Sequence, residues 1–565
     1  MKSSAKTQVQ FLVQQAVVLG LKYVVCSPGS RNAPLVIAFN QHPEIECIVI
    51  PDERSAAFYA IGMAQQTNDL VAVCCTSGSA ALNYYPAIAE AYYQQIPLIV
   101  FTADRPVAWV DQGDGQTIVQ DAVFKNHIRF STSVPENNWE KEHVWYVKRQ
   151  ISEAFYRAKG ILKGPVHINL PFSEPLYHQV EIDNQIDTTP ILVFESNQDI
   201  TINQITSLKK SWSKFSKKMI LCGQMQPNEG LENVLKFLAE DTSVLVLVEN
   251  TSNLIDRNFI HCIDRSLEGI KESELADFAP DLLIVLGGAL VSKKIKSYLR
   301  KYTPQEIWKI GADFPFMDTY QNLTFSINVN PTSFLKEFLK MENNSVSNYR
   351  NKWKQVDYIN KDKANDFIQQ QETFSDLVAN HIILDYLPEN SLLHLANSSV
   401  VRYAQLFDPV KTISTFCNRG TSGIDGSTST AAGAAFIQKD ICNILITGDI
   451  SFFYDSNAFF NRLQLGNLRI FLINNDGGGI FKIIPGPDTT EELNDFFVFN
   501  HGYSSEYICK AFEITYYKAN SIQDLENQME DFYAFSSNNK PKLMEVFTDS
   551  ELNDTVLKHY FAALS

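Results

Sequence analysis

Short apolar runs rich in β-branched residues recur along the whole chain and alternate with helix-length amphipathic stretches. Runs of this length, each closed by a glycine, a proline or a helix-capping residue, are typical of buried strands. Strands that alternate with helices favour parallel sheets with helices on both faces. The pattern therefore predicts an α/β protein. The predicted strands are 23–26, 45–50, 70–75, 97–102, 165–170, 218–223, 243–250, 281–288, 306–313, 391–397, 411–416, 442–449, 468–475 and 541–547.

Two stretches interrupt this alternation and divide the chain. Residues 180–190 are polar and rich in turn-forming residues, and residues 342–366 are strongly charged, as in a solvated helical linker. A chain of 565 residues is also too long for one hydrophobic core and indicates about three or four domains. We predict three doubly wound parallel-sheet domains, over residues 1–183, 190–345 and 366–565.

Charge and cysteine positions argue against several classes of protein. The formal net charge of −16 disfavours a surface for nucleic acid or for an anionic membrane. The nine cysteines form no C-x-x-C pair and several lie in apolar runs, which indicates reduced core residues in a reducing compartment. The N-terminus lacks a signal-peptide pattern, and no long apolar run could span a membrane. We therefore predict a cytoplasmic protein with no nucleic-acid partner and no integral membrane segment.

One strand–helix–strand unit in the last third brings together oxygen ligands suited to a metal. The strand 442–449 ends in Asp449, a capped amphipathic helix is predicted over 450–466, and the next strand ends in Asn475 before three glycines. The strands of such a unit are parallel, and open α/β sheets bind ligands at the carboxyl ends of their strands. A carboxylate, an amide oxygen and the carbonyl of Gly477 are ligands that Mg²⁺ takes together with phosphate and water. Taken singly, an Asp at a helix start and an Asn in a turn are common structural features.

The same residues carry a family resemblance. Gly448-Asp449 followed 26 residues later by Asn475 resembles the metal-binding signature of thiamine-diphosphate enzymes. In that family the Asp, the second Asn of an Asn-Asn pair and a carbonyl two residues later hold Mg²⁺, which grips the diphosphate of the cofactor. The resemblance implies thiamine diphosphate as cofactor and Asp449, Asn475 and Gly477 as ligands of Mg²⁺, with Mn²⁺ as an alternative metal.

A glutamate in the first third meets a second requirement of this family. After the strand 45–50, Asp52 can act as an N-cap, and Glu53 lies in the first turn of a helix with alanines along one face. An acid there also complements the helix dipole, which is the simpler explanation for an isolated Asp-Glu-Arg. In thiamine-diphosphate enzymes a Glu in this place contacts N1′ of the aminopyrimidine and promotes deprotonation of the thiazolium carbon. The resemblance implies that Glu53 is catalytic and binds the cofactor.

The glycine-rich segment 418–436 leads into a helix rich in serine, threonine and alanine. The helix is predicted to begin at Ser427, directly after Gly426, and its N-terminal N–H groups are suited to a diphosphate. Ile424 is a bulky apolar residue among glycines and is alternatively a buried loop anchor. By resemblance, Ile424 is the wedge that bends the cofactor, Gly426 and Ser427 bind it, and Gln116 lies near its amino group.

Further motifs narrow the resemblance. They match densely in the first and last thirds of the chain and thinly in the middle third, chiefly in LGGALVSKK (286–294). The other motifs are SPGSRNAPL (27–35), TSGSAALNYYPAIAEA (76–91), TADRP (102–106), GPVHINLPFSEPLY (164–177), NRGTSGIDG (418–426) and NNDGGGIF (474–481). Together the motifs closely resemble those of the MenD family, the synthases of menaquinone biosynthesis, which are transferases.

The MenD resemblance implies two dicarboxylate substrates. Members of that family decarboxylate 2-oxoglutarate and add the succinyl-carbanion equivalent to isochorismate in a 1,4-addition. Arginine binds carboxylates through two parallel hydrogen bonds, so an acidic protein needs several arginines in the cavity. For each arginine alone, the alternative to substrate binding is a surface ion pair. This alternative is stronger for a lysine in the middle third. The resemblance places Ser30, Arg31 and Arg105 toward isochorismate, Ser398, Arg402 and Arg419 toward the 2-oxoglutarate-derived part, Ile480 and Phe481 as an apolar wall, and Lys293 as a further substrate residue.

The resemblance also implies an architecture and an assembly. It predicts the pyruvate-decarboxylase-like fold, with an N-terminal pyrimidine-binding domain and a C-terminal diphosphate-binding domain. Active sites are then expected at the subunit interface of a homodimer or homotetramer. Two alternatives stay open: another thiamine-diphosphate decarboxylase or carboligase of the acetolactate-synthase kind, and a non-catalytic phosphate-binding regulatory protein that uses the same loops.

Overall fold

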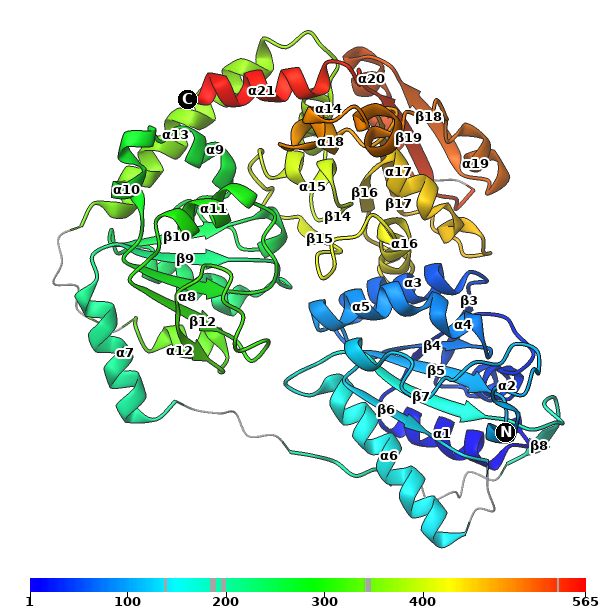
Figure 1. Ribbon diagram of the computed structural model, residues 1–565. Helices are drawn as coiled ribbons and strands as arrows, with labels where there is room; N and C mark the ends of the chain where they lie inside the picture. Colours follow the sequence, from blue (N-terminus) through cyan, green and yellow to red (C-terminus); the bar gives the residue numbers. More distant parts are fainter. Residues whose placement is uncertain (137–139, 183–188, 195–199, 340, 342–346, 536–537) are drawn as a thin grey trace.

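The fold consists of three lobes, each built on one parallel sheet between two layers of helices, and the lobes meet in the middle of the molecule (Figure 1). The predicted α/β class with parallel sheets is confirmed. A small antiparallel pair, β1 (Lys2–Ser4) and β8 (Gln179–Glu181), lies at the margin of the first lobe. The computed structural model describes residues 1–136, 140–182, 189–194, 200–339, 341, 347–535 and 538–565.

The first lobe contains a six-stranded sheet in the order β3–β2–β4–β5–β7–β6. Helices α3, α4 and α5 pack on one face, and α1, α2 and α6 pack on the other. Its elements are α1 (Thr7–Val18), β2 (Tyr23–Cys26), α2 (Ala33–Gln41), β3 (Glu46–Val49), α3 (Glu53–Thr67), β4 (Val71–Cys75), α4 (Ser79–Asn83), α5 (Tyr85–Gln94), β5 (Leu98–Asp104), β6 (Phe130–Ser133), α6 (Lys141–Lys159) and β7 (Val166–Pro171).

The central lobe contains a five-stranded sheet in the order β10–β9–β11–β12–β13. Helices α7, α8 and α12 pack on one face, and α9, α10 and α11 pack on the other. Its elements are α7 (Ile202–Lys214), β9 (Lys218–Cys222), α8 (Glu229–Leu238), β10 (Val244–Val248), α9 (Ile263–Glu268), α10 (Leu275–Phe278), β11 (Leu282–Leu286), α11 (Lys293–Lys301), β12 (Glu306–Ile310), β13 (Leu323–Ile327) and α12 (Pro331–Lys336).

The third lobe contains a six-stranded sheet in the order β15–β14–β16–β17–β19–β18, which is the strand order of the first lobe repeated. The two outer lobes therefore share a topology. Its elements are α14 (Asp376–Asp385), β14 (Leu392–Leu395), α15 (Ser399–Ala404), β15 (Ser414–Cys417), α16 (Ser427–Ile437), β16 (Asn443–Gly448), α17 (Asp449–Tyr454), β17 (Leu468–Asn474), α18 (Ile480–Ile483), α19 (Glu506–Ala511), β18 (Thr515–Ala519), α20 (Ile522–Tyr533), β19 (Lys542–Phe547) and α21 (Asn553–Leu564).

The predicted linker between the central and third lobes is partly packed. Residues 342–346 lie outside the described residues, and α13 (Tyr349–Gln369) follows. Trp353 and Asn360 of α13 are buried against the central lobe, so only one face of this charged helix is solvated. The predicted boundary at 180–190 also falls partly outside the described residues, and the division into 1–183, 190–345 and 366–565 stays a prediction.

The amphipathic helix predicted over 450–466 is wrong. The structure has the short helix α17, then a 3-10 helix at Ser456–Phe459, and no helix over the residues that lead to β17. Asp455 between the two pieces is fully buried, and its carboxylate accepts hydrogen bonds from the N–H (2.7 Å) and hydroxyl (2.7 Å) of Ser429 in α16. The carboxylate of Asp455 binds Ser429 near the start of α16, and this contact accounts for the break between α17 and the 3-10 helix.

Helices α3 and α16 cross at the contact between the first and third lobes (Figure 1). Their backbones approach closely at two glycines. A Cβ on Gly62 would lie 1.9 Å from the carbonyl oxygen of Thr430, and a Cβ on Gly433 would lie 2.2 Å from that of Tyr59. The small residues of both helices therefore serve the crossing.

Gly62→Ala is expected to destabilise the protein by about 3 kcal/mol, because a methyl group at the crossing forces two backbones apart. Urea denaturation followed by circular dichroism measures the change. Gly230→Ala in α8 is the matched control, since the nearest atoms to its Cβ are 3.5 Å and 3.6 Å away. An alanine there gains about 1 kcal/mol of helix propensity. Equal stability of the two variants would contradict this account of the crossing.

Candidate active site

The carboxyl ends of β16 and β17 lie side by side and present Asp449 and Asn475 at one edge of the third sheet. The two strands pair in parallel, as predicted from the sequence. Asp449 is the first residue of α17 and is 2% exposed. Its Oδ2 accepts the N–H of Gly477 at 2.8 Å. Both chain segments that carry the predicted metal ligands are therefore held together directly.

The amide of Asn475 is oriented by a buried carboxylate. Its nitrogen donates to Oδ2 of Asp376, the first residue of α14, at 2.7 Å, which leaves the amide oxygen for another partner. Oδ1 of Asp376 accepts the hydroxyl of Thr548 at 2.6 Å. Burial raises the pKa of Asp376 to about 6, and the charge of nearby Asp449 adds to the rise. A cation between these groups would relieve the repulsion of the two carboxylates.

Gly477 takes a backbone conformation that favours glycine. Its φ is +137°, and a Cβ there would lie 2.4 Å from the carbonyl oxygen of Val498. The carbonyl oxygen of Gly477 accepts one N–H of the turn, from Gly479 at 3.0 Å, and keeps a second lone pair. Glycine is thus required at position 477 for close packing of this turn, and the N–H of Gly477 holds the turn beside Asp449.

A histidine lies beside the same carboxylate. His501 Nε2 is 3.1 Å from Oδ2 of Asp449, and this hydrogen bond raises the pKa of His501. Asp476, which follows Asn475, fixes the segment that contains His501. The carboxylate of Asp476 accepts the N–H groups of His501 (3.0 Å) and Gly502 (2.6 Å). The segment of His501 is therefore held against Asp449 and Asp476.

These groups fit a divalent cation whose coordination shell is completed by phosphate oxygens and water. Within the described part of the chain, no three His, Cys, Asp or Glu side chains are grouped as a metal site. The set at β16 and β17 instead offers one carboxylate, one amide oxygen and one carbonyl. Mg²⁺ prefers oxygen and completes its octahedron with phosphate and water, so this donor set suits it.

The N-terminus of α16 has the features of a phosphate site. Gly426 precedes the helix, and the side chain of Phe58 from α3 covers it closely. The hydroxyls of Ser427 and Thr428 are buried, and neither finds a hydrogen-bond partner among the described residues. Orphaned buried hydroxyls at a helix N-terminus fit an anionic oxygen ligand.

Ile424 lies three residues before the start of that helix and is 36% exposed. Its carbonyl oxygen accepts the hydroxyl of Ser451 at 2.6 Å, which ties the loop to α17. The backbone of Ile424 is thus fixed while its apolar side chain stays accessible. This arrangement agrees with a wedge against a cofactor and does not fit a buried loop anchor.

Glu53 begins α3 as the sequence predicts. Asp52 is the N-cap, and its carboxylate accepts the N–H of Ser55 at 3.2 Å. Glu53 is half-buried, and its pKa is raised chiefly by burial, with a smaller contribution from the charge of Asp52. A carboxyl whose proton is held more tightly than usual is suited to hydrogen bonding with a ring nitrogen.

Arg31 and Arg105 of the first lobe form one cationic group. Arg31 is 5% exposed, and its pKa is lowered by burial and by the charge of Arg105. Arg31 pairs with Glu174 at 3.2 Å, and Arg105 pairs with Asp114 at 3.5 Å. The Nε atoms of both arginines are buried with no partner among the described residues. Both guanidinium groups therefore retain donors for a ligand.

Arg402 and Arg419 form a second cationic group where the third lobe faces the central lobe. The pKa of Arg402 is lowered by burial and by the charge of Arg419, while Asp264 and Glu249 oppose the shift. One guanidinium nitrogen of Arg419 donates to Oδ1 of Asn397 at 2.9 Å. The Nε atoms of both arginines are buried without a partner in the described part of the chain.

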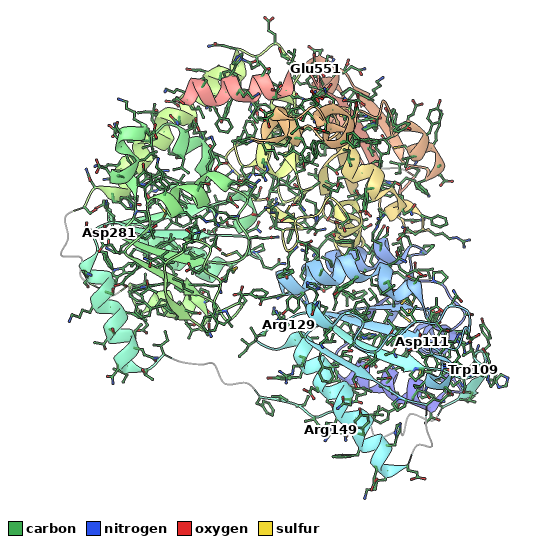
Figure 2. The ribbon with its side chains drawn as sticks, in the orientation of Figure 1. Trp109, Asp111, Arg129, Arg149, Asp281 and Glu551 are labelled. Atoms are coloured by element: carbon green, nitrogen blue, oxygen red, sulfur yellow. The ribbon has the colours of Figure 1, made fainter. Side chains whose placement is uncertain are left out.

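The remaining predicted residues keep accessible side-chain surface. Ser398 precedes α15 with φ +72° and ψ −126°, an uncommon backbone conformation that often marks functional sites. The ring of Phe481 lies 5.7 Å from that of Phe497. Gln116 follows Trp109 and Asp111 of the first lobe, which Figure 2 labels, and its carbonyl oxygen accepts the hydroxyl of Ser77 at 2.9 Å. Ser30, Gln116 and Lys293 are exposed, and Ser398, Ile480 and Phe481 are half-buried.

The structure does not join all predicted residues into one site. Within one chain, the interactions of the described residues connect Asp449 with Gly477 and connect Asn475 with Asp376, on which the charge of Asp449 acts. None connects Glu53 with the three predicted metal ligands. The first lobe contributes the Arg31 group and Glu53, and the third lobe contributes the metal ligands and the Arg402 group. The predicted site residues of one chain thus form separate groups in the two outer lobes.

Several residues at the site were not predicted. Asp376, His501 and Glu249 contact or face predicted residues from segments far away in the sequence. Asp376 follows Ser375 at a helix start, which the sequence presents as ordinary capping. His501 lies in an irregular segment without a motif. Only the three-dimensional contacts identify these residues.

Comparison with known proteins agrees with this geometry. Residues 6–124 match the family model of the thiamine pyrophosphate enzyme N-terminal TPP binding domain, and residues 193–395 match the middle domain of thiamine pyrophosphate enzymes. A 2-succinyl-5-enolpyruvyl-6-hydroxy-3-cyclohexene-1-carboxylate synthase of Flavobacterium psychrophilum is 45% identical over 97% of this chain and 96% of its own length. Synthases of the same name from Flavobacterium johnsoniae and Bacteroides thetaiotaomicron are 42% identical (98% of each chain) and 37% identical (96% of each chain).

These relatives extend over nearly the whole chain, including the middle third where the motifs are thin. The three lobes and the paired ends of β16 and β17 have the arrangement that the resemblance predicted. The chain therefore belongs to the 2-succinyl-5-enolpyruvyl-6-hydroxy-3-cyclohexene-1-carboxylate (MenD) synthases, a family of thiamine-diphosphate-dependent transferases.

Proposed function

We propose that this protein decarboxylates 2-oxoglutarate and adds the four-carbon succinyl unit to isochorismate in a 1,4-addition, a step of menaquinone biosynthesis. The observation that carries the proposal is the presence of two separate arginine groups, Arg31 with Arg105 and Arg402 with Arg419. Each group retains buried, unpaired guanidinium nitrogens. Two dicarboxylate substrates require two such groups, whereas a single small monocarboxylate requires one.

The cofactor set in this proposal is thiamine diphosphate with Mg²⁺, and Mn²⁺ is an alternative metal. Asp449, Asn475 and the carbonyl of Gly477 would hold the metal, because they are the oxygen ligands brought together at β16 and β17. Ser427, Gly426 and the start of α16 would bind the diphosphate. Bound thiamine diphosphate supplies a nucleophilic carbon and takes up the negative charge left when CO₂ departs.

The protein's own residues position the reactants and move one proton. The Glu53 carboxyl, with its raised pKa, would share a proton with N1′ of the aminopyrimidine. Ile424 would hold the cofactor bent, and Gln116 would contact its amino group. The Arg402 group with Ser398 would orient 2-oxoglutarate, and the Arg31 group with Ser30 would orient isochorismate. Ile480 and Phe481 would exclude water, and Lys293 would add a cation at the entrance from the central lobe.

The assembly in this proposal is a homodimer or homotetramer with active sites between subunits. It is supported by the absence, among the described residues of one chain, of any interaction between Glu53 and the proposed metal ligands. We also propose that the lobes are domains over residues 1–183 (pyrimidine-binding), 190–345 (central) and 366–565 (diphosphate-binding). A cytoplasmic location is supported by nine cysteines that are all free. No helix in the described ranges is long and apolar enough to cross a membrane.

Purified protein supplied with thiamine diphosphate, Mg²⁺ and 2-oxoglutarate is expected to release CO₂ and to consume isochorismate in equal amounts. Loss of isochorismate absorbance and coupled CO₂ detection measure both events. Omission of thiamine diphosphate, or addition of EDTA, should abolish turnover by removing the cofactor or its metal. Turnover of pyruvate without turnover of 2-oxoglutarate would instead indicate an acetolactate-synthase-like carboligase and refute the proposal.

A further inference from the structure

A buried carboxylate of the first lobe is surrounded by donors from the third lobe. Glu90 in α5 is 1% exposed. Its Oε1 accepts the N–H of Gly420 at 2.7 Å, and its Oε2 accepts both the N–H (2.6 Å) and the hydroxyl (2.6 Å) of Thr421. Charge-assisted hydrogen bonds of this kind are roughly twice as strong as neutral ones. Glu90 therefore fixes the backbone of the 420–421 turn across the boundary between the lobes.

The turn is shaped for this contact. A Cβ on Gly420 would lie 2.6 Å from the carbonyl oxygen of Glu90, so the approach requires glycine. The residue before it is Arg419, whose guanidinium is held by Asn397 at 2.9 Å and whose Nε has no partner among the described residues. The side chain and the following backbone of Arg419 are thus fixed from two sides, while one donor is left for a ligand.

Two glutamines extend this contact to the central lobe. Gln94, one turn after Glu90 on α5, donates to Oε1 of Glu90 and to the carbonyl oxygen of Cys417. Gln224, which follows β9, donates to the same carbonyl oxygen at 2.6 Å and to Oε1 of Gln94 at 3.2 Å. All three lobes therefore converge on the segment from Cys417 to Thr421, and Glu90 is the carboxylate that the first lobe contributes to this junction.

We propose that Glu90 is a positioning residue for the binding of 2-oxoglutarate, acting through the 420–421 turn on Arg419. The inference rests on the proposed function, in which Arg419 orients 2-oxoglutarate. A guanidinium binds a carboxylate bidentately only over a narrow range of geometry, so a shift of the turn weakens that bond. Glu90 itself touches no reacting atom. Its effect is confined to the substrate that Arg419 binds.

Glu90→Gln replaces one acceptor oxygen by an NH₂ group of the same size. In either orientation of the amide, the N–H of Gly420 or of Thr421 then faces a donor. We expect the KM for 2-oxoglutarate to rise about tenfold, while the KM for isochorismate changes less than twofold. Steady-state kinetics with each substrate varied in turn measures the split. Equal rises in both KM values, or no rise in either, would overturn the proposal.

The matched control is another buried tie between lobes. Arg265 in α9 is 3% exposed and binds Asp408 at 3.2 Å and the carbonyl oxygen of Leu406 at 3.4 Å. Arg265→Met removes a contact of similar burial that lies outside the 417–421 segment. We expect both variants to lower the midpoint of thermal unfolding, but only Glu90→Gln to raise the KM for 2-oxoglutarate. If the KM for 2-oxoglutarate rose equally in Arg265→Met, weaker packing between the lobes alone would account for the rise in Glu90→Gln.

Hydrogen–deuterium exchange separates this proposal from the proposed function. Peptides that cover residues 417–424 are expected to exchange faster in Glu90→Gln than in the wild type and in Arg265→Met. Unchanged exchange of this segment overturns the positioning role, whatever the substrate. If wild-type protein fails to turn over 2-oxoglutarate, the proposed function fails instead. Arg419→Lys shows how far the KM for 2-oxoglutarate rises when the proposed substrate contact itself is weakened. If Glu90→Gln exchanges faster over residues 417–424 but keeps wild-type KM values, the proposed effect of Glu90 on substrate binding is overturned.

Discussion

Glu53→Gln is expected to lower turnover of 2-oxoglutarate by at least a hundredfold while leaving binding of thiamine diphosphate and Mg²⁺ nearly unchanged. A glutamine fills the same volume at the start of α3 but cannot give or take a proton at the ring nitrogen. Positioned proton transfer contributes about 10²–10⁴-fold to rate. The raised pKa of Glu53 comes chiefly from burial, so the wild-type carboxyl holds its proton closer to neutral pH than an exposed glutamate does.

Two measurements test this prediction together. Initial rates of CO₂ release give the loss in turnover, and a fluorescence titration with thiamine diphosphate in excess Mg²⁺ gives the affinity. Glu46→Gln, an exposed carboxylate on β3 of the same lobe, is the control and should behave as the wild type. A Glu53→Gln variant with undiminished turnover would refute the catalytic role and favour a regulatory protein that only binds phosphate.

The inner strands of the three sheets and three of their edge strands (β3, β10 and β15) were predictable from the sequence, and the other three edge strands were not. All fourteen predicted apolar runs correspond to strands of the three sheets. The strands β6, β13 and β18 were missed, and each is the last strand at one edge of its sheet. An edge strand has one neighbour and more contact with solvent, so it does not need a continuous apolar run. The half-exposed residues of these three strands show this directly.

The candidate site was predictable only as far as it follows local motifs. Asp449 and Asn475 end adjacent strands of one βαβ unit, so their proximity follows from short-range topology. Asp376 and Glu90 act on residues 99 and about 330 positions away, and nothing in their own segments distinguishes them from ordinary helix residues. The break at Asp455 has the same origin, because that carboxylate serves a different helix. The contacts of Asp376 and Asp455 depend on how the helices and strands of the third lobe pack, and that of Glu90 depends on how the first and third lobes pack.

The lack of an interaction between Glu53 and the proposed metal ligands of the same chain connects the fold to the proposed assembly. The α3–α16 crossing fixes how the first and third lobes of one chain meet, and it seats Phe58 of α3 against Gly426 of α16. With that contact in place, Glu53 makes no interaction with Asp449 or Asn475 among the described residues. A second copy of the chain can supply the missing acid, which is why a complete site and an oligomer are proposed together.

Asp449→Asn is expected to weaken binding of Mg²⁺ and thiamine diphosphate by about a hundredfold and to abolish turnover at cofactor concentrations that saturate the wild type. The amide still accepts the N–H of Gly477, which wild-type Oδ2 accepts at 2.8 Å, so the turn is retained. The negative charge is lost, and truncating one partner of a buried charge pair costs about 2–5 kcal/mol. Each 1.4 kcal/mol is tenfold in affinity, which gives the expected magnitude.

The matched control for this variant is Asp455→Asn at the end of α17. Asp455 is also a fully buried carboxylate, with its pKa raised to about 7 by burial, but it binds Ser429 of α16. Its replacement removes a buried charge six residues from Asp449 without touching the metal ligands, so Mg²⁺ affinity should stay within a few-fold of the wild type.

Isothermal titration with Mg²⁺ in excess thiamine diphosphate compares the affinities of Asp449→Asn and Asp455→Asn for the metal. Metal affinity that falls equally in both would assign the loss to the buried charge in general, and wild-type affinity in Asp449→Asn would refute Asp449 as a ligand. Because Glu53→Gln is expected to keep the affinity that Asp449→Asn loses, the two variants separate catalysis from cofactor binding.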